Sequence, residues 1–365
     1  MNNLPHRPRR THGTPRTHRN RRGLRITALV VASSTALLLA ACVEEDSATD
    51  GPEVEQAVGL TVDVPRVTVL DPGTGELRQL RYSADTAAGT APESADGEDA
   101  TRQTLTLSVS DGFTQSVMPA AEVDPSPAPE GADVSTMRLP LTADLTAAEP
   151  VEEETLEATR EVSYTVGQPT FTDLDLAEDI NSTAGFTMGT RTDDRGQQSA
   201  LTFAAPIDAT DTGRLIMEQY LLKFASLPVI FPEEEIGMGA RWSVDSRVSG
   251  ESALLQTVTY TITGISGDVV DLDISVDQRP SLGALEINPD TTGITEDTPG
   301  QLTVLNSNTA SSGALSVDLN LPVPTSGEVS WTTRVVYGGA EDDLRVIQDS
   351  TTGLSFDDSN VVAIP

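Results

Sequence analysis

Few side chains in this sequence could carry out acid–base, nucleophilic or metal chemistry. The chain has 365 residues with a single cysteine, Cys42, and three histidines, all within the first 18 residues. Its only lysine is Lys223. Catalysis by a serine or cysteine with a histidine base, and zinc sites of histidine and cysteine, need residues that the chain after Cys42 does not have. The 56 aspartates and glutamates are the remaining candidates.

The most suggestive group of carboxylates is Asp173, Asp175 and Asp179, in the segment TDLDLAED. Its alternating acids are similar to the start of a calcium-binding loop, but the glycine at the sixth position and the final bidentate glutamate are missing. We treat it as a weak calcium candidate and expect no cofactor. Paired carboxylates could also serve a glycoside hydrolase. Such enzymes line their clefts with aromatic rings. Only 4% of the residues in the whole chain are aromatic, so we do not expect an enzyme.

Cys42 stands directly after a basic segment and an apolar one. Residues 1–25 contain eight arginines and no acidic residue, and residues 26–41 carry no charge. The apolar segment is shorter than the roughly 20 residues that a membrane-spanning helix needs. A basic region, a short apolar region and small residues at its end are typical of a secretory signal. We therefore place a signal peptide at residues 1–41.

The end of this signal, Leu39, Ala40, Ala41 and Cys42, resembles the lipobox of bacterial lipoproteins. The resemblance implies cleavage before Cys42 and a thioether between its sulfur and diacylglycerol. Two acyl chains hold a protein stably at a bilayer, whereas one chain binds only marginally. The expected location is the outer face of the cytoplasmic membrane, with the membrane as a partner through the lipid on Cys42.

The charge of the mature chain restricts its partners. Eight of the 23 basic residues and none of the 56 acidic ones precede Cys42, which leaves 15 basic residues and a formal net charge of −41. Nucleic-acid phosphates bind lysine and arginine patches, so we expect no nucleic acid as a partner. Residues 42–57 are acidic and poor in large apolar side chains, which predicts a flexible tether between the lipid and a folded domain.

Residues 58–365 show the period-two alternation of half-buried β-strands. The clearest runs are residues 103–109, 160–166, 240–248, 256–263, 268–277, 314–321 and 328–337. In the run 160–166, for example, Val162, Tyr164 and Val166 share a face. Asp193–Gly196 supplies turn residues between two such runs. One apolar and one polar face per strand favours an antiparallel sheet, since parallel sheets are normally covered on both faces.

Residues 211–226 break this alternation and predict a helix that Pro228 stops. Six apolar side chains form a broad stripe at helical spacing: Ile216, Met217, Tyr220, Leu221, Phe224 and Leu227. Leu215 and Leu222 fall on the opposite side. The helix is therefore either covered on both sides, or it presents these two leucines to a ligand or a partner. Core packing is the favoured interpretation.

These patterns predict a mainly β (α+β) protein. We expect a strongly curved antiparallel sheet or half-barrel with the helix on its concave face, and a β-sandwich is the alternative. Because the chain is longer than a typical domain, a division into two sub-domains near residue 205 is also considered.

A segment after the expected helix carries a second resemblance. A proline-bearing stretch followed by Ile-Gly-x-Gly-x-x-Trp, with Gly237, Gly239 and Trp242, resembles a family of uncharacterised bacterial lipoproteins frequent in actinobacteria. The resemblance covers roughly residues 60–360 and brings no activity or catalytic residue. Physically, the two glycines predict a tight bend, and Trp242 predicts a core anchor.

Two functions remain open at this point. The first is a non-enzymatic, lipid-anchored envelope lipoprotein whose sheet and helix enclose an apolar ligand, such as a lipid or another envelope component. The second is a structural or protein-interaction lipoprotein that displays an acidic surface. A cavity beneath the helix would favour the first.

Overall fold

The structure, a computed structural model, describes residues 52–84, 101–123, 133–151, 156–248, 254–282, 284–286, 301–339 and 343–357. The signal, the lipobox and Cys42 lie outside these residues. Residues 49–365 form one compact unit, and residue 205 falls inside it. The last part of the expected tether belongs to this unit, because Glu55 donates its backbone N–H to the oxygen of Ala205 at 2.8 Å.

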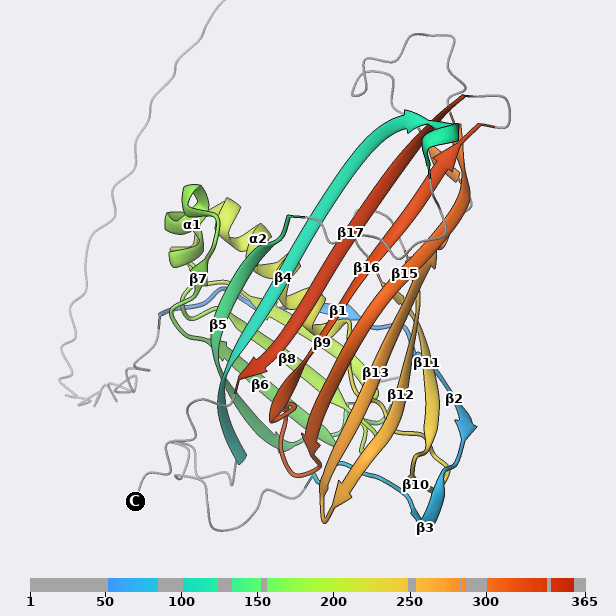
Figure 1. The fold of residues 1–365 in the computed structure, drawn as a ribbon. Helices are drawn as coiled ribbons and strands as arrows, with labels where there is room; N and C mark the ends of the chain where they lie inside the picture. Colours follow the sequence, from blue (N-terminus) through green and yellow to red (C-terminus); the bar gives the residue numbers. More distant parts are fainter. Residues whose placement is uncertain are drawn as a thin grey trace, which may run out of the picture. The chain divides into compact units, whose positions relative to one another are not determined.

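Among the described residues, fifteen strands form one antiparallel sheet (Figure 1). Its main path runs β1 (Val58–Thr61), β9 (Gln198–Ala204), β8 (Thr187–Thr192), β6 (Arg160–Val166), β5 (Ser135–Ala147), β4 (Thr101–Pro119), β17 (Leu344–Asp357), β16 (Ser326–Gly338), β15 (Gln301–Asp318), β13 (Val269–Pro280), β12 (Leu254–Ser266), β11 (Arg241–Val248) and β2 (Arg66–Asp71). In addition, β14 (Ala284–Glu286) pairs with β15, and β7 (Thr170–Phe171) pairs with β5. A separate pair joins β3 (Thr74–Arg78) and β10 (Ile236–Met238).

The sheet is strongly curved, as its two edge strands demonstrate. β1 and β2 stand at opposite ends of the main path, yet only residues 62–65 link them. An extended chain spans at most about 3.6 Å per residue, so this linker holds the two edges within roughly 20 Å of each other. The edges are not paired with each other, so the described sheet stays open. The prediction of a strongly curved antiparallel sheet is confirmed, and the sandwich alternative is not adopted.

The predicted helix is α2 (Asp211–Ala225). It begins where the Thr210 hydroxyl accepts the N–H of Gly213 at 3.0 Å, and the N–H of Ser226 caps its end. Phe224 near its end contacts Tyr164 of β6 and Phe356 of β17, with ring centroids 5.6 and 6.2 Å apart. In the sheet β5 and β4 separate β6 from β17, yet both strands meet the same helix, so the sheet curves around α2 and the helix lies on its concave face.

One large apolar cluster unites this helix with both halves of the sheet, and a small second cluster lies at Leu302, Val335 and Tyr337. The large cluster includes Leu107 and Leu139 from the long strands, Met217 and Leu221 from α2, and Trp242 beyond it. Three shorter helical segments complete the fold: η1 (Ala120–Glu122), η2 (Leu174–Leu176) and α1 (Ala177–Asn181). None of the helices in the described ranges has the length and apolar character required to cross a bilayer.

Candidate functional site

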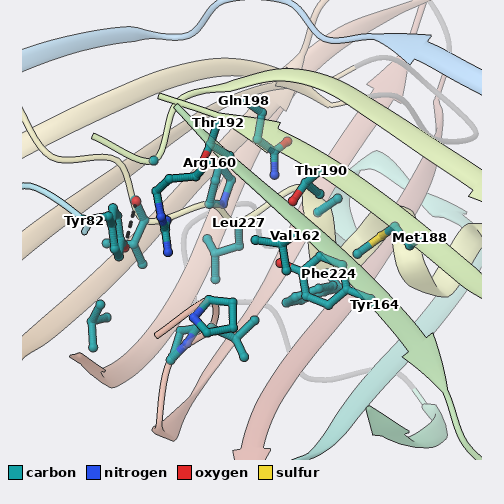
Figure 2. Close-up of a pocket in the computed structure, with 18 of the residues that line it drawn as sticks. Tyr82, Arg160, Val162, Tyr164, Met188, Thr190, Thr192, Gln198, Phe224 and Leu227 are labelled. Atoms are coloured by element: carbon teal, nitrogen blue, oxygen red, sulfur yellow. Dashed lines mark hydrogen bonds between the residues drawn. The ribbon is translucent and has the colours of Figure 1, made fainter. Parts of the chain in front are cut away.

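A cavity of about 80 Å³ lies at the C-terminal end of α2. Its walls come from the beginning of β6, from β8 and β9, from the end of α2, and from the ends of β15 and β17. Figure 2 shows two unlike ends. Tyr82 and Arg160 lie at one, and the side chains of Val162, Tyr164, Met188 and Phe224 gather toward the other.

One wall is the extended segment that follows α2, and three aromatic side chains hold it. Tyr260 donates its hydroxyl to the oxygen of Pro228 at 2.7 Å, and Tyr82 donates to that of Val229 at 3.2 Å. The indole N–H of Trp242 donates to the oxygen of Ile230 at 2.7 Å. These bonds satisfy buried carbonyls that no neighbouring strand reaches. Burial raises the pKa of Tyr82 and Tyr260, so both hydroxyls stay protonated as donors.

A glycine turn brings the opposite wall close to this segment. Gly196, in the turn between β8 and β9, has φ +92°, a left-handed conformation that glycine adopts most readily. A Cβ atom at this position would lie 2.5 Å from the oxygen of Val229 and 2.8 Å from the ring of Tyr82. The glycine therefore permits the backbone approach that narrows this end of the cavity.

Arg160, the first residue of β6, is the charged group of the cavity. Its side chain is buried, and the residue is only 3% exposed. Nε donates to the oxygen of Ser83 at 3.0 Å, and Nη2 donates to that of Leu321 at 3.2 Å. The guanidinium carbon lies 4.6 Å from the ring centroid of Tyr82, at the distance of a cation–π contact. Burial lowers the pKa of Arg160, but an arginine remains protonated in proteins.

No carboxylate among the residues that the structure describes forms an ion pair with Arg160. Beside it on β8, Thr192 is directly opposite in the register of the two strands. The Thr192 hydroxyl oxygen is buried and has no hydrogen-bond partner in the part of the chain that the structure describes. Buried polar groups are normally hydrogen-bonded, so an unpaired hydroxyl on a residue that lines a cavity is a candidate partner for a polar ligand atom.

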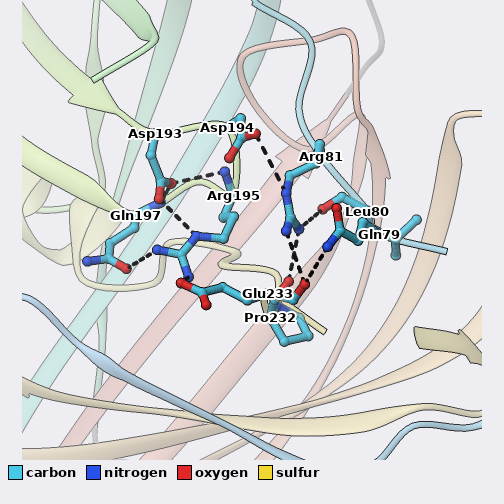
Figure 3. A network of polar contacts seen from close by, with 9 residues as sticks. All are labelled: Gln79, Leu80, Arg81, Asp193, Asp194, Arg195, Gln197, Pro232 and Glu233. Atoms are coloured by element: carbon cyan, nitrogen blue, oxygen red, sulfur yellow. Dashed lines mark hydrogen bonds and ion pairs between the residues drawn. The ribbon is translucent and has the colours of Figure 1, made fainter. Parts of the chain in front are cut away.

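A second, half-buried arginine, Arg195, has its charge paired within the protein instead (Figure 3). Arg195 donates Nε to Asp193 at 2.9 Å, Nη1 to Glu233 at 3.0 Å and Nη2 to the side-chain oxygen of Gln197 at 3.1 Å. The other oxygen of Asp193 accepts the backbone N–H groups of Arg195 and Gln197 at 2.9 and 2.8 Å. Charge and donors are thus satisfied within the protein, which indicates a structural role.

The weak calcium candidate is not assembled into a metal site. Asp173 accepts the N–H of Asp175 at 3.1 Å and caps η2, while Asp179 accepts the hydroxyl of Thr210 at 2.7 Å and joins α1 to α2. Across the described ranges, no group of three or more His, Cys, Asp or Glu side chains is placed to hold a metal ion.

The two leucines singled out on the helix do not line the cavity. Leu215 and Leu222 are 58% and 38% exposed. The packing surface of α2 is formed instead by Met217, Tyr220 and Leu221, which are buried.

A larger hollow of about 560 Å³ lies outside, along β2, β11 and β12. It is lined by the exposed arginines Arg66, Arg247 and Arg279 together with Asp63 and Asp245. Both signs of charge are present and the arginines face solvent. We therefore place the candidate site at the cavity beside α2, whose charged group is buried.

Sequence analysis overlooked Arg160, although a signal for it was present. Val162, Tyr164 and Val166 were assigned to one face of a strand, and Arg160 continues that face two residues earlier. A charged residue in phase with a buried apolar face indicates either an internal ion pair or a site.

Comparisons with known proteins gave no match: none was found among models of protein families, curated proteins or solved structures.

Proposed function

We propose that this chain is a lipid-anchored, non-enzymatic lipoprotein of the cell envelope that binds a ligand with an apolar part in the cavity at the end of α2. The observation that supports the proposal most is the cavity itself, whose apolar wall includes Val162, Met188, Phe224 and Leu227. Ligand sites are typically concave, mostly apolar and provided with a few polar groups that fix orientation.

The size of the cavity limits which ligands can fit inside it. At about 80 Å³ it is smaller than an engineered cavity of about 150 Å³ that admits benzene. A whole lipid therefore does not fit within it. The ligand is either a small molecule or a larger envelope component that inserts one end into the cavity, against Phe224 and Leu227.

A cavity-filling substitution tests the binding proposal. Ala225, the last residue of α2, lines the cavity, so Ala225→Leu should fill it. Native mass spectrometry of the acylated protein, purified from membranes in mild detergent, should show a bound species in the wild type that the variant has lost. Gln219→Leu introduces the same side chain at an exposed position of the same helix and should keep the species. A wild-type protein that carries nothing and takes up no small apolar probe contradicts the proposal.

The anchor is tested separately at Cys42, which lies outside the described residues. Cys42→Ser should abolish the mass increase of a diacylglycerol and leave the signal uncleaved, because both steps need the thiol. The lipobox interpretation fails if the variant is processed and retained at the membrane like the wild type.

The second candidate, an interaction lipoprotein with an acidic surface, is supported by the exposed Leu215 and Leu222 on α2. Crosslinking in intact cells would then capture a protein partner at α2, and Leu215→Ser with Leu222→Ser should remove it.

A further inference from the structure

We propose that the ligand of the cavity carries a carboxylate, and that the Arg160 guanidinium and the Thr192 hydroxyl bind it. This inference rests on the proposed function, because it names the chemical class of the ligand in the same cavity. It is argued from four features of the site: the donors that Arg160 leaves unused, the missing counter-ion, the orphan hydroxyl beside it, and the single charge.

The guanidinium group of Arg160 retains unused donors. A guanidinium has five N–H groups. Two of them are accounted for by the carbonyl oxygens of Ser83 and Leu321. The remaining three belong to a group that lines the cavity, and no protein acceptor for them is present among the described residues. Two parallel N–H groups of an arginine match the two oxygens of a carboxylate.

The missing counter-ion is the second feature. An isolated charge is costly to bury, and buried charges are normally paired. Two carbonyl oxygens and the face of Tyr82 stabilise Arg160 but do not neutralise it. This arrangement is unexpected in a chain with more than twice as many acidic as basic residues. A ligand carboxylate would supply the negative charge that the described residues do not place beside Arg160.

The orphan hydroxyl lies in the right place to share that carboxylate. Arg160 and Thr192 are directly opposite each other on β6 and β8. Residues opposite each other in an antiparallel pair have Cβ atoms about 4.5–5.5 Å apart and point to the same side of the sheet. The Thr192 hydroxyl is buried and has no partner among the described residues, so a rotation of this side chain toward the cavity would let it donate to one carboxylate oxygen while the guanidinium donates to the other.

The single positive charge favours a carboxylate over a phosphate monoester, which carries up to two negative charges. Arg160 is the only Lys or Arg among the described residues that line the cavity. The end of α2 that reaches the cavity is its C-terminal end, whose partial charge is negative and disfavours additional anionic charge. A monoanion with a short apolar part satisfies both constraints. Its apolar part would lie against Val162 and Phe224.

The carboxylate has two chemical sources that the cavity does not distinguish: a free short-chain acid, or the carboxylate end of a longer chain whose remainder stays outside. Calorimetric titration of the wild-type acylated protein with butyrate and with octanoate separates them. Equal affinity for both indicates that the site recognises the short acid, and a large gain with octanoate indicates that contacts outside the cavity also contribute.

The decisive experiment compares the affinity of the protein for butyrate with its affinity for a neutral analogue, butyramide. Butyrate should bind the wild type at least about tenfold more tightly than butyramide, which has nearly the same shape without the charge. Affinity for butyrate should be constant from pH 9 to pH 6 and fall as the pH drops through the acid's pKa, roughly 4–5. The direction follows because Arg160 stays charged throughout, whereas the ionised carboxylate that it binds disappears.

Variants at Arg160 assign the preference to this residue. Arg160→Gln should remove the tenfold preference for butyrate, and Arg160→Lys should retain part of it, because an ammonium keeps the charge but loses the fork of donors. Thermal unfolding shows whether each variant is folded. If Arg160→Gln does not fold, the butyrate and butyramide affinities of the wild type still decide.

The possible outcomes separate this inference from the proposed function. Equal binding of butyrate and butyramide overturns the role of Arg160 but leaves a ligand-binding cavity. A preference for butyrate that survives in a folded Arg160→Gln variant also overturns it. If neither compound binds and the Ala225→Leu variant changes nothing, the proposed function fails as well.

Discussion

Arg195 and Arg160 are two arginines in neighbouring parts of the fold, the first half-buried and the second buried, and their surroundings are opposite. Arg195 reaches two carboxylates and a glutamine oxygen, and it stands in a turn that Asp193 closes (Figure 3). Arg160 is buried more deeply but meets two carbonyl oxygens, an aromatic face and a cavity (Figure 2).

The two arginines differ in whether carboxylates of the protein neutralise their charge, and this difference distinguishes a structural arginine from one that could bind a ligand. The charge of Arg195 is neutralised within the protein, so its environment needs nothing from outside. The environment of Arg160 is incomplete, since the charge is buried at a cost that the described residues do not offset. Incomplete sites of this kind are maintained only if the surrounding fold is stable enough to hold them, and here the aromatic donors to residues 228–230 provide that support.

The largest expected effect on stability comes from removing Asp193, which neutralises Arg195. Asp193→Ala should lower the free energy of unfolding by about 3 kcal/mol, because it leaves the half-buried Arg195 without its closest carboxylate. It also removes the acceptor of two backbone N–H groups. Urea unfolding followed by tryptophan fluorescence measures the change.

The neighbouring Asp194 provides the control for this experiment. Its side chain is 50% exposed and lies 3.6 Å from Arg81. Asp194→Ala should cost less than about 1 kcal/mol, as exposed ion pairs do. Equal losses for Asp193→Ala and Asp194→Ala would contradict the view that Asp193 completes a structural site.

The next largest effect concerns the incomplete site. Without ligand, Arg160→Met should lower the free energy of unfolding by only about 1–2 kcal/mol, since lost hydrogen bonds are offset by removal of an unpaired buried charge. A carboxylate at 100 times its dissociation constant should stabilise the wild type by about 2.7 kcal/mol and the variant hardly at all. Urea unfolding with and without butyrate measures both. A variant as unstable as Asp193→Ala would show that Arg160 is chiefly structural.

Much of the fold could be predicted from the sequence because it depends on local periodicity. Alternation of apolar and polar residues located most of the long strands, and the change of period located α2 to within a residue of its end. Trp242 was expected to be a core anchor, and it is fully buried and stacked on Tyr260, with ring centroids 5.3 Å apart.

The order of the strands could not be predicted, because it depends on pairings between distant segments. β17 pairs with β4 along its whole length, and Leu344 lies opposite Pro119. Nothing in either strand alone specifies this partner. The same limit applies to the cavity, whose walls come from Tyr82, Arg160 and Val323, each in a different part of the chain. Only Arg160, in phase with Val162, gave a local sign of the site.

A smaller effect is expected from the orphan hydroxyl. Thr192→Val keeps the shape of the side chain and removes a buried hydroxyl that has no partner, so the unliganded protein should become more stable, by about 0.5–1 kcal/mol. Butyrate should bind this variant more weakly than the wild type. The control is Thr190→Val, two residues earlier on β8, where a hydrogen bond with Tyr164 is lost and stability should fall. Lower stability of Thr192→Val would show that its hydroxyl is satisfied after all.

The smallest effect belongs to an arginine that is paired but exposed. Arg102 on β4 donates to both oxygens of Asp144 on β5 at 2.6 and 3.1 Å, and the two side chains are 49% and 27% exposed. Solvent screens such a pair, so a double-mutant cycle with Arg102→Ala and Asp144→Ala should give a coupling of about 0.5 kcal/mol that disappears in 1 M salt. The same cycle with Arg195→Ala and Asp193→Ala should give several times more and persist in salt. Similar couplings for the two pairs would mean that burial does not strengthen an ion pair here. The inference that the buried charge of Arg160 costs free energy without a counter-ion would then lose its support.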